Sequence, residues 1–189
     1  DLAVVSSIQD RVSILLNAGS GTFGAATPVG VGMFPLGAAI GDFDEDGDLD
    51  LAVTNTADST IQLLSNNGSG VFAPGAATVV GGSPEAVVVG DVNNDGHLDV
   101  VAANQVQSDV NILFGDGMGG FAVSSGMIGA SQDGVALDDL NGDGRLDILT
   151  ETFALGSVTA LLNLTGTRIV TPSACLLYTS DAADEVAWG

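Results

Sequence analysis

Three related nine-residue stretches, rich in acidic side chains, recur along the chain and constrain its fold more than any other feature. They are DFDEDGDLD (42–50), DVNNDGHLD (91–99) and DLNGDGRLD (139–147), so their first residues lie 49 and 48 positions apart. A period near 50 residues is typical of repeat architectures, and the blades of β-propellers have about this length. The 189 residues hold about three and a half periods, fewer than the roughly 4 to 8 blades of a closed ring. We therefore predict part of a propeller, with apolar surface exposed at its two ends.

Other landmarks keep the same spacing. Phe23, Phe72 and Phe121 are each 49 residues apart, and each follows a glycine-rich turn. The opening DLAVV matches DLAVT at 50–54 and DVVAA at 99–103. Asp1 thus corresponds to the last residue of an acidic stretch, and we expect the natural N-terminus to lie upstream of it.

Within one period the residues read as four strands. For residues 50–98 these are LAVTNT, TIQLLSN, FAPGAATVVG and EAVVVGDV. Leu49, Leu51 and Val53 alternate with Asp50, Ala52 and Thr54, which is the period of two that marks a strand. Asn-Gly, Gly-Ser-Gly and Ser-Pro separate the strands and favour hairpin turns. The sequence therefore predicts an all-β fold, a partial β-propeller of four-stranded antiparallel blades in repeats of 48–49 residues.

The charge of the chain restricts its partners. Its formal net charge is −21, with three arginines and no lysine, so nucleic acid and anionic membrane surfaces are poor partners because both require cationic side chains. No run of about 18 apolar residues is present, which predicts no membrane insertion. Of the 24 acidic residues, 12 lie inside the three acidic stretches. A cation is therefore the expected partner.

The acidic stretches share the pattern D-x-D-x-D-G-x-x-D, which suits calcium. Ca²⁺ takes 6 to 8 oxygen ligands from carboxylates, amides and carbonyls. Positions 1, 3, 5 and 9 offer side-chain oxygens, position 7 offers its backbone carbonyl, and glycine at position 6 permits a sharp turn. We expect the leucine at position 8 (Leu49, Leu98, Leu146) to pin each loop to the core. The sequence predicts about three calcium sites, with the ligands Asp42, Asp44, Asp46, Asp48, Asp50; Asp91, Asn93, Asp95, His97, Asp99; and Asp139, Asn141, Asp143, Arg145, Asp147, of which Asp48, His97 and Arg145 act through the backbone carbonyl.

Two other interpretations of these loops were weighed. Solvated acidic turns without an ion remain the alternative to calcium. An EF-hand would need a glutamate at position 12, where this chain has Val53, Ala102 and Thr150. Helices should also flank an EF-hand loop, whereas alternating strand patterns flank these. The loops are therefore expected to join two strands of one sheet.

At these residues the chain resembles the FG-GAP or VCBS repeat family, the calcium-binding blades of integrin alpha-subunit propellers and their bacterial relatives. The segments IGDFDEDGDLDLAV (40–53) and VGDVNNDGHLDVV (89–101) carry the resemblance, which covers about residues 1–166. It implies a β-propeller, usually of seven blades, with calcium in hairpin loops and an extracellular or cell-surface setting. The third loop departs from the pattern, because Asp138 replaces the glycine that precedes the first ligand elsewhere (Gly41, Gly90). We therefore question its entry geometry.

No catalytic constellation emerges from the sequence. GDGMGG (115–120) fits a dinucleotide-binding fingerprint, but it occupies the repeat position of a hairpin turn and strand-like residues follow it. His97 is the only histidine, and we expect its side chain to be solvated. We predict a non-catalytic calcium-binding module of a secreted or cell-surface protein, with a structural, adhesive or partner-binding role toward a protein or glycan. The alternative is the propeller part of a polysaccharide-acting enzyme or lectin, although the repeats contain neither Trp nor Tyr.

The C-terminal residues break the repeat. We assign residues 1–166 to the propeller fragment and residues 167–189 to a non-repeat tail. The segment CLLYTSDAADE (175–185) reads as a translated sequencing-library adapter, so we expect the natural sequence to end near Ala174.

Overall fold

The computed structural model describes residues 1–106, 109–127, 133–152, 156–163 and 178–179, and every regular element in them is a β-strand. No helix among these residues is long and apolar enough to cross a membrane. The strands are β1 (Leu2–Ser6), β2 (Arg11–Leu15), β3 (Asn17–Gly19), β4 (Thr22–Phe23), β5 (Thr27–Gly30), β6 (Pro35–Gly41), β7 (Asp50–Asn55), β8 (Thr60–Asn66), β9 (Phe72–Val79), β10 (Pro84–Gly90), β11 (Asp99–Asn104), β12 (Asp109–Gly115), β13 (Phe121–Met127), β14 (Gly134–Asp138), β15 (Asp147–Thr152), β16 (Ser157–Leu161) and β17 (Tyr178–Thr179).

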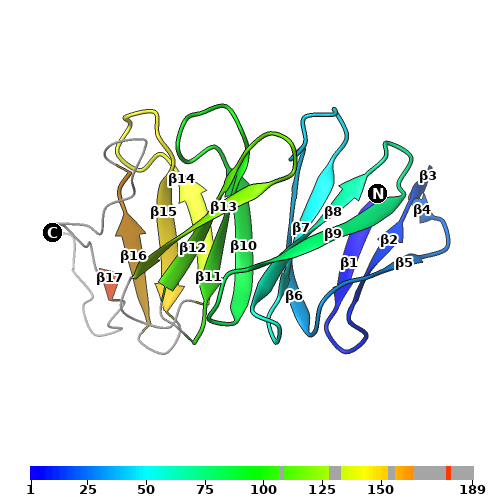
Figure 1. Ribbon diagram of the computed structural model, residues 1–189, viewed down its shortest axis with the longest axis horizontal. Coiled ribbons are helices and arrows are strands. Elements are labelled where there is room, and N and C mark those ends of the chain that lie inside the picture. Colours follow the sequence, from blue (N-terminus) through cyan, green and yellow to red (C-terminus); the bar gives the residue numbers. More distant parts are fainter. Residues whose placement is uncertain (107–108, 128–132, 153–155, 164–177, 180–189) are drawn as a thin grey trace, which may run out of the picture.

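The strands form four antiparallel sheets that stand side by side, which is the arrangement of part of a β-propeller (Figure 1). Their strand orders are β1-β2-β5, β6-β7-β8-β9, β10-β11-β12-β13 and β14-β15-β16-β17, and β3-β4 form a separate small hairpin. The acidic stretches connect β6 to β7, β10 to β11 and β14 to β15, along the upper edge in Figure 1. The predicted all-β propeller fragment and its hairpin-joining loops are confirmed.

The blades begin one strand earlier than the sequence period suggests. The period counted over residues 50–98 ends on β10, but β10 pairs with β11 and not with β9. Each blade therefore consists of the strand before an acidic loop and the three strands after it. Among the strands that precede the loops, β10 contacts both β6 and β14, so the three strands lie in a row where the blades meet.

Apolar side chains fill the space between neighbouring blades. In β7, Leu51 and Val53 pack toward β2, whereas Ala52 packs toward β11. Both faces of β7 and β11 are buried along their whole length. This happens because the central strand of a propeller blade has a neighbouring blade on each side, so the alternation in the sequence sorts side chains between two interfaces rather than between core and solvent.

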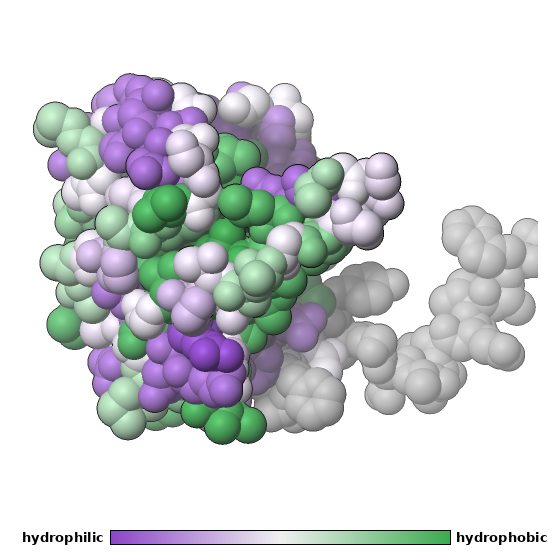
Figure 2. All heavy atoms as spheres, turned by 90° about the vertical axis from the view of Figure 1, so that its right-hand side faces the viewer, coloured by the Kyte–Doolittle hydropathy of each residue, from purple (hydrophilic) through white to green (hydrophobic). Residues whose placement is uncertain are grey.

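The N-terminal blade exposes apolar side chains, as predicted for an end blade. Leu2 and Val4 of β1 are 47% and 49% exposed, whereas Leu51 and Val53, which occupy the equivalent places in β7, are buried. Figure 2 shows hydrophobic residues gathered across the middle of this end of the molecule, with hydrophilic residues above and below them. Among the described residues no other sheet packs against this face, which accounts for the exposure.

Two further expectations concern the turn at residues 115–120 and the tail. The turn connects β12 to β13, and its Asp116 side chain accepts hydrogen bonds from the N–H groups of Met118 and Gly120 at 2.9 Å each. It is therefore a hairpin turn, as expected. The tail prediction (167–189) lies outside the described residues except for Tyr178–Thr179, which pair with β16.

Candidate metal centre

The three acidic loops share one backbone conformation. Positions 4 and 6 of each loop have positive φ angles, which turn the chain back on itself. The values are 58° and 92° for Glu45 and Gly47, 59° and 94° for Asn94 and Gly96, and 76° and 83° for Gly142 and Gly144. Glycine at position 6 was predicted to make this turn. The second left-handed residue at position 4 was not, and only the asparagine and glycine found there in two loops could have indicated it.

The first aspartate of each loop closes the turn. Its Oδ2 accepts the N–H of the position 6 glycine, at 3.1 Å in the first loop, 2.9 Å in the second and 2.8 Å in the third. In the third loop the N–H of Gly144 is the main reason why the pKa of the Asp139 carboxyl lies below its ordinary value. The third loop therefore has the same closure as the other two, although Asp138 precedes it in place of glycine.

Positions 3 and 5 form smaller turns inside each loop. The position 5 carboxylate accepts the N–H of position 7 at 2.9–3.0 Å. In the second loop this N–H, from His97, lowers the pKa of the Asp95 carboxyl. Asn93 and Asn141 at position 3 each accept the N–H of position 5 at 2.9 Å. These bonds hold the side-chain oxygens at the inside of a tight loop.

The last aspartate of each loop is fully buried and links the loop to the sheet. One oxygen of Asp50 accepts the N–H of Phe43 in its own loop at 3.2 Å, and the other accepts the N–H of Asn66 at the end of β8 at 2.8 Å. Asp99 and Asp147 repeat both bonds, with donors that are likewise 7 residues before and 16 residues after the aspartate. Burial raises the pKa of the Asp50 and Asp99 carboxyls, against the opposing effect of these N–H donors. The two N–H donors therefore do not fully offset the unfavourable burial of an ionised carboxylate at this position.

The first loop brings three carboxylates together. Ligand oxygens of Asp42, Asp44 and Asp50 all lie within 4.8 Å of one another. Oδ1 of Asp42 and Oδ1 of Asp44 are buried and accept no hydrogen bond. Two buried anionic oxygens without donors are unfavourable unless a cation is near. A hard cation that takes oxygen ligands, such as Ca²⁺, fits this donor set.

The other predicted ligands are arranged differently. Asp46 lies outside the group of three carboxylates, and no second group of this kind occurs among the described residues. In the second and third loops the amides of Asn93 and Asn141 replace the carboxylate at position 3. The Nδ2 of Asn93 donates to Oδ2 of Asp95 at 2.7 Å. The ligand roles of these two loops, and of the carbonyls of Asp48, His97 and Arg145, remain predictions.

The side chains at position 7 connect loops to their surroundings. Nδ1 of His97 lies 2.6 Å from Oε1 of Glu45, so the second loop contacts the first, and Glu45 raises the pKa of the imidazole. The His97 side chain is 37% exposed, in line with the expected solvated imidazole, but the sequence did not indicate its pairing with Glu45. Arg145 binds the backbone oxygen of Asn163 through Nε at 2.6 Å and pairs with Asp143.

The leucines at position 8 pack between blades, with one exception. A Cβ on Gly41 would lie 2.7 Å from Cδ1 of Leu98, and a Cβ on Gly90 would lie 2.7 Å from Cδ1 of Leu146. The glycine before each of these two loops therefore makes room for the leucine of the following loop. Leu49 is 60% exposed, so the prediction that it pins the first loop to the core is wrong.

In the first two loops position 2 holds a core residue that the pattern does not reveal. Phe43 and Val92 are 3% and 2% exposed and lie in two different interfaces between blades. Phe43 also meets Phe121 edge to face, with ring centroids 5.8 Å apart. The first two loops are therefore anchored from both ends, by the apolar position 2 and by the buried aspartate at position 9, whereas Leu140 at position 2 of the third loop is 42% exposed.

The comparison with protein families decides the identity of these repeats. A model described as an FG-GAP-like repeat matches residues 1–53, 42–102 and 91–150. The chain belongs to the FG-GAP-like repeat family. Each of the three matched spans contains at least one complete acidic loop, and together the spans cover the chain without a gap from the first blade into β15. A search of curated proteins found no match.

Proposed function

We propose that this FG-GAP-like repeat chain is a calcium-binding β-propeller module of a secreted or cell-surface protein. The observation that supports calcium most directly is the group formed by Asp42, Asp44 and Asp50, with its two buried oxygens that accept no hydrogen bond. The matching backbone of the other two loops extends the proposal to three sites. Bound Ca²⁺ would offset the repulsion between carboxylates and would tie each loop to the sheet through its buried position 9 aspartate.

The proposed role of the ion is structural and the module is non-catalytic. The carboxylates of the loops are engaged by backbone N–H groups of the same loops, which suits rigid coordination better than proton transfer. The module would then act as a stable platform for adhesion or for binding a protein or glycan. Extracellular calcium modules typically bind with dissociation constants of about 10⁻⁴–10⁻³ M, and we expect affinities in this range.

Calorimetric titration of the full chain with CaCl₂, after chelator treatment, tests the metal. We expect saturable binding at about three sites and a melting temperature that rises with calcium, by about 1.4 kcal/mol of stability per site when free calcium is ten times the dissociation constant. Magnesium at the same concentration should bind more weakly, because it demands smaller, octahedral coordination. An absence of calcium-dependent heat together with unchanged melting would refute the proposal.

The proposed partner role needs a separate measurement. Secretion is tested by locating the tagged full-length protein in culture medium, cell surface and cytoplasm. Partner binding is tested with glycan and protein arrays in the presence of calcium. Sugar turnover by the calcium-loaded chain would favour the enzyme alternative instead.

A further inference from the structure

The acidic loops of neighbouring blades are joined by hydrogen bonds to their position 2 carbonyls. The carbonyl oxygen of Phe43 in the first loop accepts the N–H of Gly119 in the third blade at 3.0 Å. The carbonyl oxygen of Val92 in the second loop accepts a hydrogen bond from Nδ2 of Asn163 at 2.6 Å, and Asn163 donates its own N–H to Asp147 of the third loop at 2.7 Å. Position 2 stands between two predicted ligands, at positions 1 and 3. Each of these bonds therefore holds the backbone of one loop from the blade that follows it.

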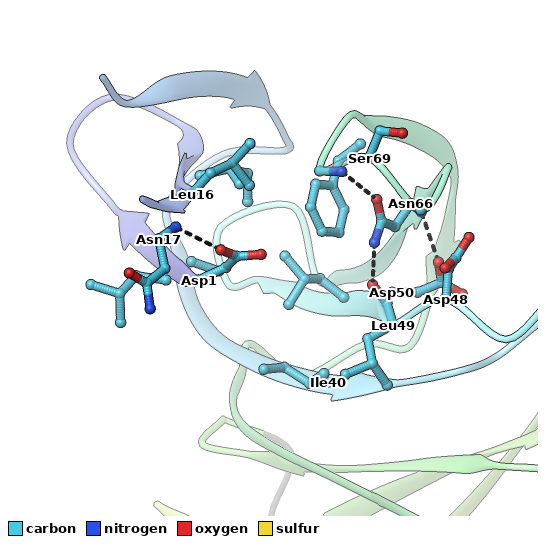
Figure 3. A pocket seen from close by; sticks show the side chains of 16 residues that line it. Asp1, Leu16, Asn17, Ile40, Asp48, Leu49, Asp50, Asn66 and Ser69 are labelled. Carbon is cyan, nitrogen blue, oxygen red and sulfur yellow. Dashed lines mark hydrogen bonds between the residues drawn. The ribbon is translucent and has the colours of Figure 1, made fainter. Parts of the chain in front are cut away.

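The donor for the first loop is itself tied to the second loop. The position 9 aspartate of a loop accepts an N–H from the end of the following strand, as Asp50 does from Asn66 at 2.8 Å (Figure 3). In the third blade Asp99 accepts the N–H of Gly115, the last residue of β12, at 2.9 Å. The turn that follows β12 carries Gly119, and its own hydrogen bonds keep it closed. A continuous chain of bonded residues thus runs from Asp99 in the second loop to the backbone of the first loop.

A side-chain contact joins the same two loops directly. Oε1 of Glu45 lies 2.6 Å from Nδ1 of His97. Glu45 stands between the predicted ligands Asp44 and Asp46, and His97 is predicted to offer its carbonyl. The turn between β12 and β13, toward the upper edge in Figure 1, closes over this pair, because a Cβ on Gly117 would lie 2.5 Å from Nδ1 of His97 and 2.8 Å from Oε1 of Glu45. The two loops and the turn therefore pack as one unit, in which a shift of one part displaces the others.

We propose that the first and second loops bind calcium cooperatively, because each filled loop orders the other through the turn at residues 115–120 and the contact between Glu45 and His97. The inference rests on the proposed calcium binding. An ion in the second loop fixes Asp99 and the backbone at His97, the two points where that loop meets the connection to the first. Part of the conformational entropy that the first loop loses on binding is then already lost, so its ion binds more tightly. Coupling of this kind acts equally in both directions, and we expect a change in affinity of about fivefold to twentyfold, at the low end of the usual range.

Calcium titration of the ¹⁵N-labelled full chain, followed loop by loop, tests the coupling. The N–H of Gly47 reports the first loop and that of Gly96 the second, because each donates to the first aspartate of its own loop. The second loop is disabled by Asp91→Asn with Asp95→Asn, which keeps an acceptor oxygen at both positions. The calcium concentration that half-saturates the Gly47 shift should then rise by about fivefold to twentyfold. We call this ratio the coupling factor.

The reverse experiment gives a second readout. Disabling the first loop by Asp42→Asn with Asp44→Asn should raise the half-saturating concentration for Gly96 by the same factor, as linkage requires. In that variant calcium should still slow hydrogen exchange of the Gly119 N–H, although this group donates to the backbone of the unfilled loop. Slowed exchange there reports the ordering itself, independently of the affinities.

Two variants break the connection without touching a proposed ligand. Glu45→Asn introduces the residue that position 4 of the second loop carries with the same left-handed backbone, but its side chain is one methylene shorter and no longer reaches His97. Gly117→Ala pushes a methyl group into the contact. Each should reduce the coupling factor by about half or more, and the charge lost on disabling the second loop does not affect this comparison because it is the same in every background. Asn94→Gly at position 4 of the second loop, and Gly19→Ala, two repeats before Gly117 and with no atom within 4 Å of its Cβ, are the matched controls and should keep the factor.

Three results would overturn the proposal, and they separate it from calcium binding itself. Equal half-saturation of Gly47 with and without the second loop's ligands would show independent sites and would leave the calcium proposal intact. A coupling factor that both Glu45→Asn and Gly117→Ala leave unchanged would show that the coupling does not pass through this contact. An absence of calcium-dependent shifts at Gly47 and Gly96 alike would refute calcium binding and the coupling with it.

Discussion

Replacing Asp44 by asparagine should stabilise the metal-free protein and destabilise the calcium-loaded protein. Asp44 belongs to the group whose ligand oxygens lie within 4.8 Å of one another. At that separation two unit charges repel by about 0.9 kcal/mol at a dielectric constant of about 80 and about 3.5 kcal/mol at about 20. Asp44 takes part in two such pairs, and partial exposure with salt screening keeps the effect near the lower figure. Asp44→Asn should therefore add about 1–2 kcal/mol of stability in chelator.

Calcium should reverse the sign. An ion present at 100 times its dissociation constant stabilises the fold by about 2.7 kcal/mol, and about 0.4 kcal/mol remains if the variant binds about 100-fold more weakly. The loss exceeds the relief of repulsion, so the variant should be less stable than wild type by about 1 kcal/mol in calcium. For a domain of this size about 1 kcal/mol corresponds to roughly 2–4 °C in melting temperature.

The assay is thermal unfolding of wild type, Asp44→Asn and Asp48→Asn, each in chelator and in excess calcium. Asp48 is the matched control, because it carries the same charge in the same loop but is predicted to use only its backbone carbonyl. We expect the crossover for Asp44→Asn and nearly parallel shifts for Asp48→Asn. Equal shifts of Asp44→Asn under both conditions, or the same crossover in the control, would show that the three carboxylates do not share an ion.

Three further predictions concern packing and pH. Gly37→Ala should lower the free energy of unfolding by about 1–3 kcal/mol, because its Cβ would lie 2.5 Å from a backbone oxygen of β10. The control Gly30→Ala, whose Cβ would have no atom within 4 Å, should change it by less than about 0.5 kcal/mol. Equal denaturant midpoints for the two variants would contradict this prediction. Phe43→Ala should lower stability by about 3–5 kcal/mol since the ring is 3% exposed, and a smaller loss in chemical denaturation would mean that the interface relaxes. In chelator, the free energy of unfolding should decrease as pH rises above about 4, because the raised pKa values of Asp50 and Asp99 disfavour their ionised forms in the folded state. Melting temperatures measured across this pH range check the sign. The decrease should be smaller in the double variant Asp50→Asn, Asp99→Asn than in the wild type.

Much of the fold follows from short-range patterns. The alternation around Leu51 and Val53 and the glycine-rich turns predict strands and hairpins correctly, because both depend on neighbours a few residues apart. The blade boundary differs, since the repeat itself does not say whether β10 joins the strands before it or after it. Pairing in register with β11 decides this, and pairing depends on long-range contacts that a single period does not reveal.

The candidate site divides in the same way. The sequence predicts the acidic residues and the left-handed glycine at position 6, because a turn of nine residues is a local structure. It does not show that Asp42, Asp44 and Asp50 are the carboxylates that converge, nor that Asp50 binds the N–H of Asn66. The exposure of Leu49 was missed for a related reason, because the burial of that side chain depends on a blade neighbour that no local pattern describes.

By itself the sequence determines that the chain is a repeat of hairpin-joined strands with acidic, glycine-turned loops, since these properties arise from backbone preferences and from charge along the chain. Tertiary structure alone decides which face of each strand meets which blade, and it sets the close approach of Leu98 to Gly41 and the pairing of His97 with Glu45. These contacts join residues about one repeat apart, and their geometry depends on how one twisted sheet is rotated against the next. No rule of local spacing contains that rotation, because it results from the packing of whole blades.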